Sequence, residues 1–409
     1  MEDASPPDLA TRPALHVGLL WHTFLSENLG VGALTIANSN LIANAVIKAG
    51  YRPVFHLIGS RGTYDYTAES PYESTFTNVG YKAMANPFSS LHSQFRRCDI
   101  VFDIGAGYRF SDIYPWSRFN LILSSKFATR LAGTKLVLSP QTIGPFFSKR
   151  AKFAASEALS LASAVFARDE TSLALLETMG FADKSSLTTD VAFALPFTMP
   201  ADKDSRDLAK GPIKVGVNVS ALLYRRDLSQ GDKIALAADY PALIDTIFDR
   251  LTADPRVELH LVPHVLAHTM PYEDDYAVSE MLKERYPAAI LPPRFAGPSQ
   301  AKTYIAGLDL LLGSRLHATI AAISSGTAVL SLGYSRKFNG LFGSLGYHWN
   351  SDLTAESNAA ILEKFDAAMA DLPTVRREAV AANAEAQQRL GNYTAFVDRT
   401  IADLVAKNA

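Results

Sequence analysis

The chain has 409 residues, a length typical of two or three domains and too great for one simple domain. Hydrophobic residues make up 48% and charged residues 20%, as in globular proteins that bury sizeable cores. The 39 Lys and Arg against 41 Asp and Glu give a formal charge of −2, which argues against a protein that coats nucleic acid. The single cysteine, Cys98, excludes an intrachain disulfide and a cysteine-based zinc site.

The N-terminus carries acids and prolines where a signal peptide needs basic residues followed by an apolar run. The longest weakly polar stretch, residues 317–334, contains a histidine, several Ser and Thr, and Gly326. It predicts a buried helix followed by a buried strand rather than a transmembrane segment. We therefore expect a cytoplasmic protein, with peripheral attachment to the inner face of a membrane as a second option.

Short apolar segments alternate with helical patterns through the first half of the chain. The first segment, 15–21, precedes a glycine-containing loop and a helix whose apolar residues recur at steps of three and four up to Ala49. Gly50 follows, where a helix end favours a residue that tolerates positive φ. Further strands are expected at 54–58, 99–104, 135–138 and 164–167. This alternation indicates a parallel sheet covered by helices on both faces.

The pattern lapses between 196 and 212, in a polar, proline-containing stretch typical of a linker. A second series then has strands at 214–219, 257–262, 308–312 and 328–332, with helices centred near 246, 280, 302 and 320. We predict an α/β protein of two doubly wound, Rossmann-like domains that face each other across a cleft. The predicted division is an N-terminal domain at 14–196, a linker at 197–212, a C-terminal domain at 213–385 and a C-terminal helix at 386–409.

Two glycine loops are candidate ligand sites, because ligands of such sheets collect at the carboxyl ends of the strands. Gly105-Ala-Gly107 follows a strand, but Phe110 stands where the dinucleotide fingerprint needs a small residue, so support for an NAD site is weak. Asn28 and Gly30 precede the first helix and could present backbone N–H groups to a phosphate or a sugar. For both loops a plain turn remains the alternative.

A pair of histidines follows a strand in the second half. His264 and His268 have a spacing that binds zinc on a helix, but the glutamate expected beside the first histidine is absent. The sequence favours loop contacts with a ligand, together with Asp275, or a purely structural His264. We predict no metal site.

The most specific candidate is the start of a helix that follows the apolar strand at 308–312. Arg315 and His317 stand there, where charged groups are costly unless they are paired or bind something. Arginine offers a fork for carboxylate or phosphate, and histidine exchanges protons near neutral pH. Pairing of Arg315 with a local carboxylate such as Asp309 is the alternative. Arg168 has the same position in the first half, with its acidic neighbours as alternative partners, and Lys337 follows a later strand, where a solvated lysine is the usual outcome.

Eight short motifs, taken in order, resemble the polysaccharide pyruvyl transferase family over most of the chain, from about Val17 to Gly346. They are Asn28-x-Gly30, Gly105-x-Gly107, 141–145, 167–172, 190–193, Pro263-His264 with Asp274-Asp275, 313–318 and 334–337. One departure is Val31, where the first motif usually has an acid, which bears on acceptor recognition or a loop contact. A milder one is Gly105-Ala-Gly107 in place of three glycines.

The resemblance implies a GT-B-like fold and an enzyme that moves the pyruvyl group of phosphoenolpyruvate onto two saccharide hydroxyls. The product is a pyruvate ketal, formed during exopolysaccharide or cell-surface glycan synthesis, and the acceptor could be lipid-linked. Arg168, Arg315 and Lys337 would bind the donor, which carries about three negative charges, and His317 would be the catalytic proton carrier. The acceptor or loop candidates are Asn28, Gly30, Gly105, Gly107, His264 and Asp275. No cofactor, metal or nucleic-acid partner is expected.

Two other functions remain open from the sequence. A GT-B glycosyltransferase would share the fold and the cationic cleft but would use a nucleotide sugar. A non-catalytic sugar- or anion-binding homologue is the second alternative, which the altered residue Val31 keeps open.

Overall fold

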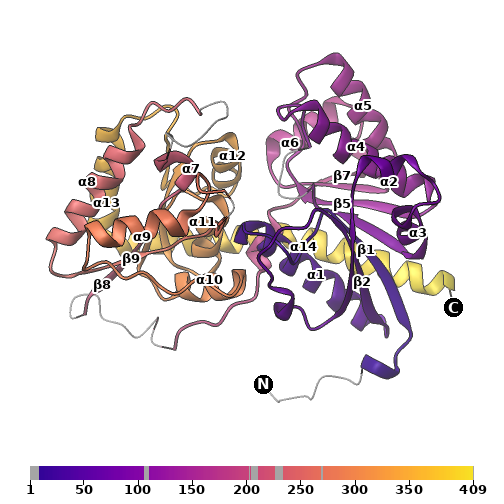
Figure 1. Ribbon diagram of the computed structural model, residues 1–409, viewed down its shortest axis with the longest axis horizontal. Helices are drawn as coiled ribbons and strands as arrows, with labels where there is room; N and C mark the ends of the chain where they lie inside the picture. The colour runs from indigo at the N-terminus through magenta and orange to yellow at the C-terminus, as the bar shows by residue number, and fades with distance from the viewer. Residues whose placement is uncertain are drawn as a thin grey trace.

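Two parallel sheets form the framework of the protein, seen in a computed structural model that describes residues 9–105, 110–201, 203, 211–225, 234–268 and 270–408. One sheet has the strand order β3-β2-β1-β4-β5-β6-β7 and the other β12-β11-β10-β8-β9, and every ladder described in them is parallel. Figure 1 shows the two α/β lobes side by side, with the last helix crossing from one to the other. The predicted fold class is confirmed.

The first sheet contains β1 (Ala14–Leu20), β2 (Arg52–Gly59), β3 (Glu73–Asn78), β4 (Ile100–Asp103), β5 (Lys135–Gln141), β6 (Ala164–Ala167) and β7 (Ser185–Leu187). Its helices are α1 (Leu29–Lys48), α2 (Tyr81–Ala85), α3 (Ser90–Arg97), α4 (Trp116–Leu131), α5 (Lys149–Ser160) and α6 (Glu170–Thr178). The apolar runs predicted as strands are strands. β3 and β7 were not predicted, because β3 is a polar edge strand and β7 has three residues.

The second sheet contains β8 (Ile213–Asn218), β9 (Val257–Leu261), β10 (Leu310–Gly313), β11 (Ala328–Gly333) and β12 (Asn350–Asp352). Its helices are α7 (Ala221–Tyr224), α8 (Tyr240–Ala253), α9 (Asp275–Arg285), α10 (Pro298–Ala306), α11 (Leu316–Ser324), α12 (Arg336–Ser344) and α13 (Asn358–Ala370). The final helix, α14 (Leu372–Asn408), begins well before residue 386, where the sequence pattern placed its start. Much of the predicted linker lies outside the described residues, and the domain limits remain predictions.

Helix α1 connects the sequence pattern to the packing of both lobes. The Asn28 side chain accepts the Gly30 N–H at 2.9 Å and caps the helix, and Gly50 follows its end with φ 90°. α1 is long and apolar enough to cross a membrane, but 72% of that window is buried inside the protein. The burial is on several sides, because α1 contacts β2, α10, α11 and α14.

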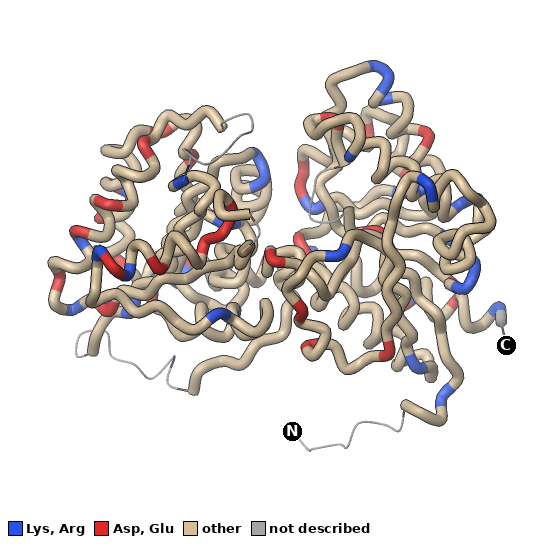
Figure 2. Tube along the Cα trace, in the orientation of Figure 1, with Lys and Arg blue, Asp and Glu red and all other residues tan. Residues whose placement is uncertain are grey.

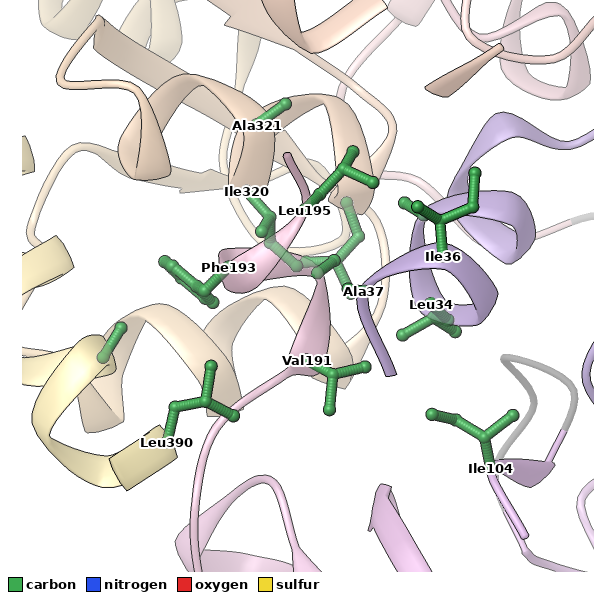
Figure 3. Packing of buried hydrophobic residues seen from close by; sticks show 14 of the residues in the cluster. Leu34, Ile36, Ala37, Ile104, Val191, Phe193, Leu195, Ile320, Ala321 and Leu390 are labelled. Carbon is green, nitrogen blue, oxygen red and sulfur yellow. The ribbon is translucent and has the colours of Figure 1, made fainter. Parts of the chain in front are cut away.

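Each lobe has a hydrophobic cluster of its own, and a further cluster contains residues of both lobes. Figure 3 shows Leu34 of α1, Phe193 of the short 3₁₀-helix η5 (Val191–Ala194), Ile320 of α11 and Leu390 of α14 packed in the same cluster. Domains that meet through small polar interfaces usually move relative to each other. Here an apolar interface joins them, and it fixes how the carboxyl ends of the two sheets face each other.

Candidate functional site

A cleft of about 690 Å³ lies between the carboxyl ends of the two sheets. Its lining comes from loops after β1, β2 and β4 in one lobe and after β8, β9, β10 and β11 in the other. The charged and aromatic lining residues include Glu27, Arg61, Tyr114, His264, Glu273, Arg315, His317, Tyr334 and Lys337. Five of the site residues predicted from the sequence line the cleft: Asn28, His264, Arg315, His317 and Lys337. A sixth, Asp275, lies beneath the cleft and pairs with Arg315.

Arg315 is held in the cleft wall by a fully buried carboxylate. Its Nε and Nη2 donate to Asp275 at 3.1 and 2.7 Å, and its backbone N–H donates to the Asn218 side chain at 2.8 Å. Burial alone would lower the pKa of Arg315, but the Asp275 charge outweighs it and the net direction is upward. Arg315 is therefore a permanent, oriented cation. Its partner is Asp275 rather than Asp309, whose carboxylate accepts the Lys214 N–H at the opposite end of β10.

Asp190 connects Arg168 with His317 across the lobes. Arg168, at the end of β6, donates from Nη1 to Asp190 Oδ2 at 2.5 Å and from Nε to Thr142 at 2.8 Å. The same Oδ2 lies 3.8 Å from His317 Nε2, too far for a hydrogen bond. Burial raises the pKa of Asp190, but Arg168 and His317 outweigh it and hold the pKa well below its usual range. Asp190 is therefore a carboxylate that faces the imidazole.

His317 itself stands at the second position of α11, with 14% of its side chain exposed. Its Nε2 is buried and has no hydrogen-bond partner within the described residues. The ring packs on α1 of the other lobe, since a Cβ at Gly30 would lie 2.2 Å from Nδ1. Position 30 therefore needs glycine because only a hydrogen leaves room for the ring.

The His264 segment joins the two lobes through the backbone. Leu29 N–H donates to His264 O at 3.2 Å, and Leu266 N–H donates to Glu27 O at 2.8 Å. Burial, reinforced by the nearby His317 and Arg315, lowers the pKa of His264 to about 3. Its imidazole is therefore neutral near pH 7.

Gly105, which follows β4, is not among the residues that line the cleft. Gly105 adopts φ 66°, donates its N–H to Asp103 Oδ1 at 2.8 Å, and leaves no room for a Cβ beside Gln141. Asp103 also pairs with Lys126 at 2.6 Å, both fully buried. Gly107 lies outside the described residues. The turn at Gly105 thus has a clear structural role.

Arg168 is 4% exposed and is not among the residues that line the cleft. Two residues without a predicted role take part in the site: Asp190, within the motif 190–193, and Arg61, which follows β2 and lines the cleft. The position of Arg61 in the loop that follows β2 was the signal that could have identified it. Within the described ranges, no group of three or more His, Cys, Asp or Glu side chains could hold a metal ion.

Two parallel-sheet α/β lobes of this kind are the architecture of GT-B glycosyltransferases and of epimerases with the same fold. Among solved structures, Anabaena HepE in complex with UDP and glucose covers 95% of this chain and 99% of its own, with 14% identity and a TM-score of 0.55. A glycosyltransferase from Rickettsia africae has 11% identity and a TM-score of 0.58, covering 97% of this chain and 100% of its own. Likeness at these identities shows the fold alone.

Residues 39–336 match the polysaccharide pyruvyl transferase family. This is most of the chain, and the protein belongs to that family and is a transferase. The matched region contains Arg168, Asp190, Arg315 and His317, while Asn28 and Gly30 precede it and Lys337 follows it. The amylovoran biosynthesis protein AmsJ of Erwinia amylovora is 22% identical over 342 residues, covering 80% of this chain and 78% of that protein.

Proposed function

We propose that this protein transfers the pyruvyl group of phosphoenolpyruvate to two hydroxyls of a saccharide during exopolysaccharide or cell-surface glycan synthesis. Family membership supports the transferase class, and the likeness to AmsJ supports the exopolysaccharide setting. The observation that carries the proposal is that Arg315 and His317 share one cleft wall, with the Asp190 carboxylate 3.8 Å from the imidazole.

Arg315 and Lys337 are the proposed donor-binding cations in the cleft, and Arg61 is a third one that lines it. Bonds to described residues engage Nε and Nη2 of Arg315, and none of them engages Nη1. A guanidinium oriented in this way suits a carboxylate or a phosphate. We propose that Arg168 acts from beneath the cleft, by fixing Asp190 and its charge, rather than by direct contact with the donor in this geometry.

His317 is the proposed general acid. The Asp190 carboxylate lies 3.8 Å from the imidazole. In its protonated form this imidazole delivers a proton to the methylene carbon of the donor and leaves the neighbouring carbon electron-poor. One sugar hydroxyl then adds to that carbon and loses its proton. Phosphate leaves with the electrons of its C–O bond, and a second hydroxyl adds and loses its proton to complete the ketal. Neutral His264 is the less suitable acid, because its pKa is about 3.

The test is incubation with phosphoenolpyruvate and a panel of saccharides. Phosphate release should match a mass gain of one pyruvic acid less one water in the saccharide. His317→Gln is the matched inactive control. Turnover of a nucleotide sugar instead would establish the glycosyltransferase alternative, and binding without turnover of either donor would favour a non-catalytic homologue.

A further inference from the structure

Among the exposed aromatic side chains of the N-terminal lobe, which also include Tyr81 and Phe88, three belong to the α4 and α5 region. Phe147 is 71% exposed, Phe153 69% and Trp116 42%. They come from the loop before α5, from α5 itself and from the first residue of α4. Single exposed apolar residues are common, but three large ones on neighbouring elements mark a surface that has a partner.

Two contacts hold the segments that carry Phe147 and Trp116 in place. The Asp112 carboxylate accepts the backbone N–H groups of Phe147 at 2.8 Å and Ser148 at 3.0 Å, and so holds the loop against the start of the α4 region. The Arg150 guanidinium lies 5.2 Å from the centre of the Trp116 ring. Phe153 follows Arg150 by three residues and shares its face of α5. We call Trp116, Phe147, Phe153 and the cations among them the aromatic–basic surface.

Cations outnumber acids on this surface, where the Asp112 carboxylate is engaged by the Phe147 and Ser148 N–H groups and Glu157 lies one turn beyond Phe153. Lys149, Arg150 and Lys152 are exposed, and the segment 147–153 contains no acid. Figure 2 shows blue at the tip of this lobe, where Figure 1 places α5. Exposed aromatic rings between cations are the composition that binds an anionic lipid interface, since the rings enter the headgroup region while the cations meet the phosphates.

The aromatic–basic surface is continuous with the cleft. Ile113, which is 50% exposed, and Tyr114 line the cleft, and Asp112 directly before them holds the Phe147 loop. The loops that carry these residues follow β4 and β5 at the carboxyl edge of the sheet, on the same side as the cleft. A bilayer bound to this surface therefore lies next to the cleft opening.

We propose that the aromatic–basic surface docks the protein on an anionic lipid bilayer. Docking gives an acceptor carried on a lipid a short path into the cleft. That last step rests on the proposed function, whereas docking itself does not.

The test is cosedimentation of the full chain with phosphatidylcholine vesicles, with and without phosphatidylglycerol. Wild type should bind the anionic vesicles and be released by salt. Lys149→Gln, Arg150→Gln and Lys152→Gln should each weaken binding about fivefold, and together about a hundredfold. Phe147→Ser with Phe153→Ser should abolish most of what remains, while melting temperatures stay near wild type because all five side chains are exposed.

Matched controls lie on the same lobe away from this surface. Lys48→Gln, Arg130→Gln and Lys135→Gln remove three exposed cations, and Leu131→Ser removes an apolar side chain that is 80% exposed. These variants should bind vesicles as wild type does. Equal binding by both variant sets, or no preference for anionic vesicles, overturns the proposal.

If the aromatic–basic surface bound a second copy of this chain instead of a bilayer, the result would differ. The phenylalanine variant would then shift a dimer to a monomer in analytical ultracentrifugation, without any vesicle binding by wild type, and the proposal would be wrong. Failure of docking is distinct from failure of the proposed function. Vesicle binding without pyruvyl transfer to any acceptor counts against the enzyme proposal, and transfer to a water-soluble acceptor without vesicle binding counts against docking.

Discussion

The imidazole of His317 lies over Gly30 so closely that any Cβ at position 30 would stand 2.2 Å from its Nδ1. The two residues belong to different lobes, and each lies in the first turn of its helix, His317 in α11 and Gly30 in α1. The glycine motif at the first helix thus sets the orientation of the proposed acid.

Gly30→Ala should displace the His317 ring and lower kcat by at least about tenfold, because a misplaced acid loses part of the 10²–10⁴-fold that general acid catalysis contributes. Donor affinity should change little. Gly391→Ala on α14 is the matched control, since a Cβ there meets nothing within 4 Å and alanine stabilises a helix interior by about 1 kcal/mol. Normal turnover in Gly30→Ala would show that the ring position is not required.

Arg315→Ala should weaken phosphoenolpyruvate binding by about ten- to a hundredfold, because a charge-assisted bond to the donor contributes roughly 1.5–3 kcal/mol. It also leaves Asp275 buried without its cation, which destabilises the fold by roughly 3–5 kcal/mol. Arg315→Lys keeps the charge but loses the fork, so it separates the two effects. Calorimetry with the donor and thermal melting are the measurements, and unchanged donor affinity in a folded Arg315→Lys would contradict the role.

His317→Gln should keep most donor binding but reduce kcat by at least about a hundredfold, because a general acid acts mainly in the transition state. The substitution preserves the approximate size of the side chain, so the melting temperature should stay near wild type. Steady-state kinetics and donor calorimetry on one preparation distinguish a catalytic role of His317 from a positioning role. Lost affinity with normal kcat at saturation would make His317 a positioning residue.

Acid should destabilise the protein through two buried histidines. The pKa of His264 is about 3, lowered by burial and nearby positive charge, and burial lowers the pKa of His22 to about 3 as well. In the unfolded chain both imidazoles bind a proton near pH 6.5, whereas in the folded chain they stay neutral down to about pH 3. The free energy of unfolding is therefore highest above pH 6.5 and declines as the pH falls toward 3. Each histidine should contribute about 1 kcal/mol per pH unit to the slope.

Urea unfolding at several pH values between 7 and 5 measures this slope. His264→Gln should reduce the slope by the contribution of one histidine, about 1 kcal/mol per pH unit. His22→Gln should reduce the slope by a similar amount, because burial lowers the pKa of that histidine to about 3 as well. Identical slopes in wild type and His264→Gln would contradict the assignment.

Much of the fold could be predicted from the sequence because buried parallel strands are continuous apolar runs, as in β1, β5 and β11. β3 could not, since its edge position lets polar residues alternate. The placement of Arg315 and His317 followed from their position directly after β10. The Asp275 partner did not follow, because proximity in sequence favours Asp309, which lies at the other end of that strand. Contacts such as Asp190 with His317 depend on how the two lobes pack, which local patterns do not encode.

The shared hydrophobic cluster also affects how the protein unfolds, because it contains residues of α1, η5, α11 and α14. Two-domain proteins often melt in two steps, one for each domain. Each lobe has a hydrophobic cluster of its own, but either lobe alone would also present the apolar faces of Leu34 or Ile320 to water. We therefore expect unfolding to be a single cooperative transition. Substitutions that disrupt the packing of α14 should also disturb the proposed site, although α14 contributes no residue to the described cleft lining.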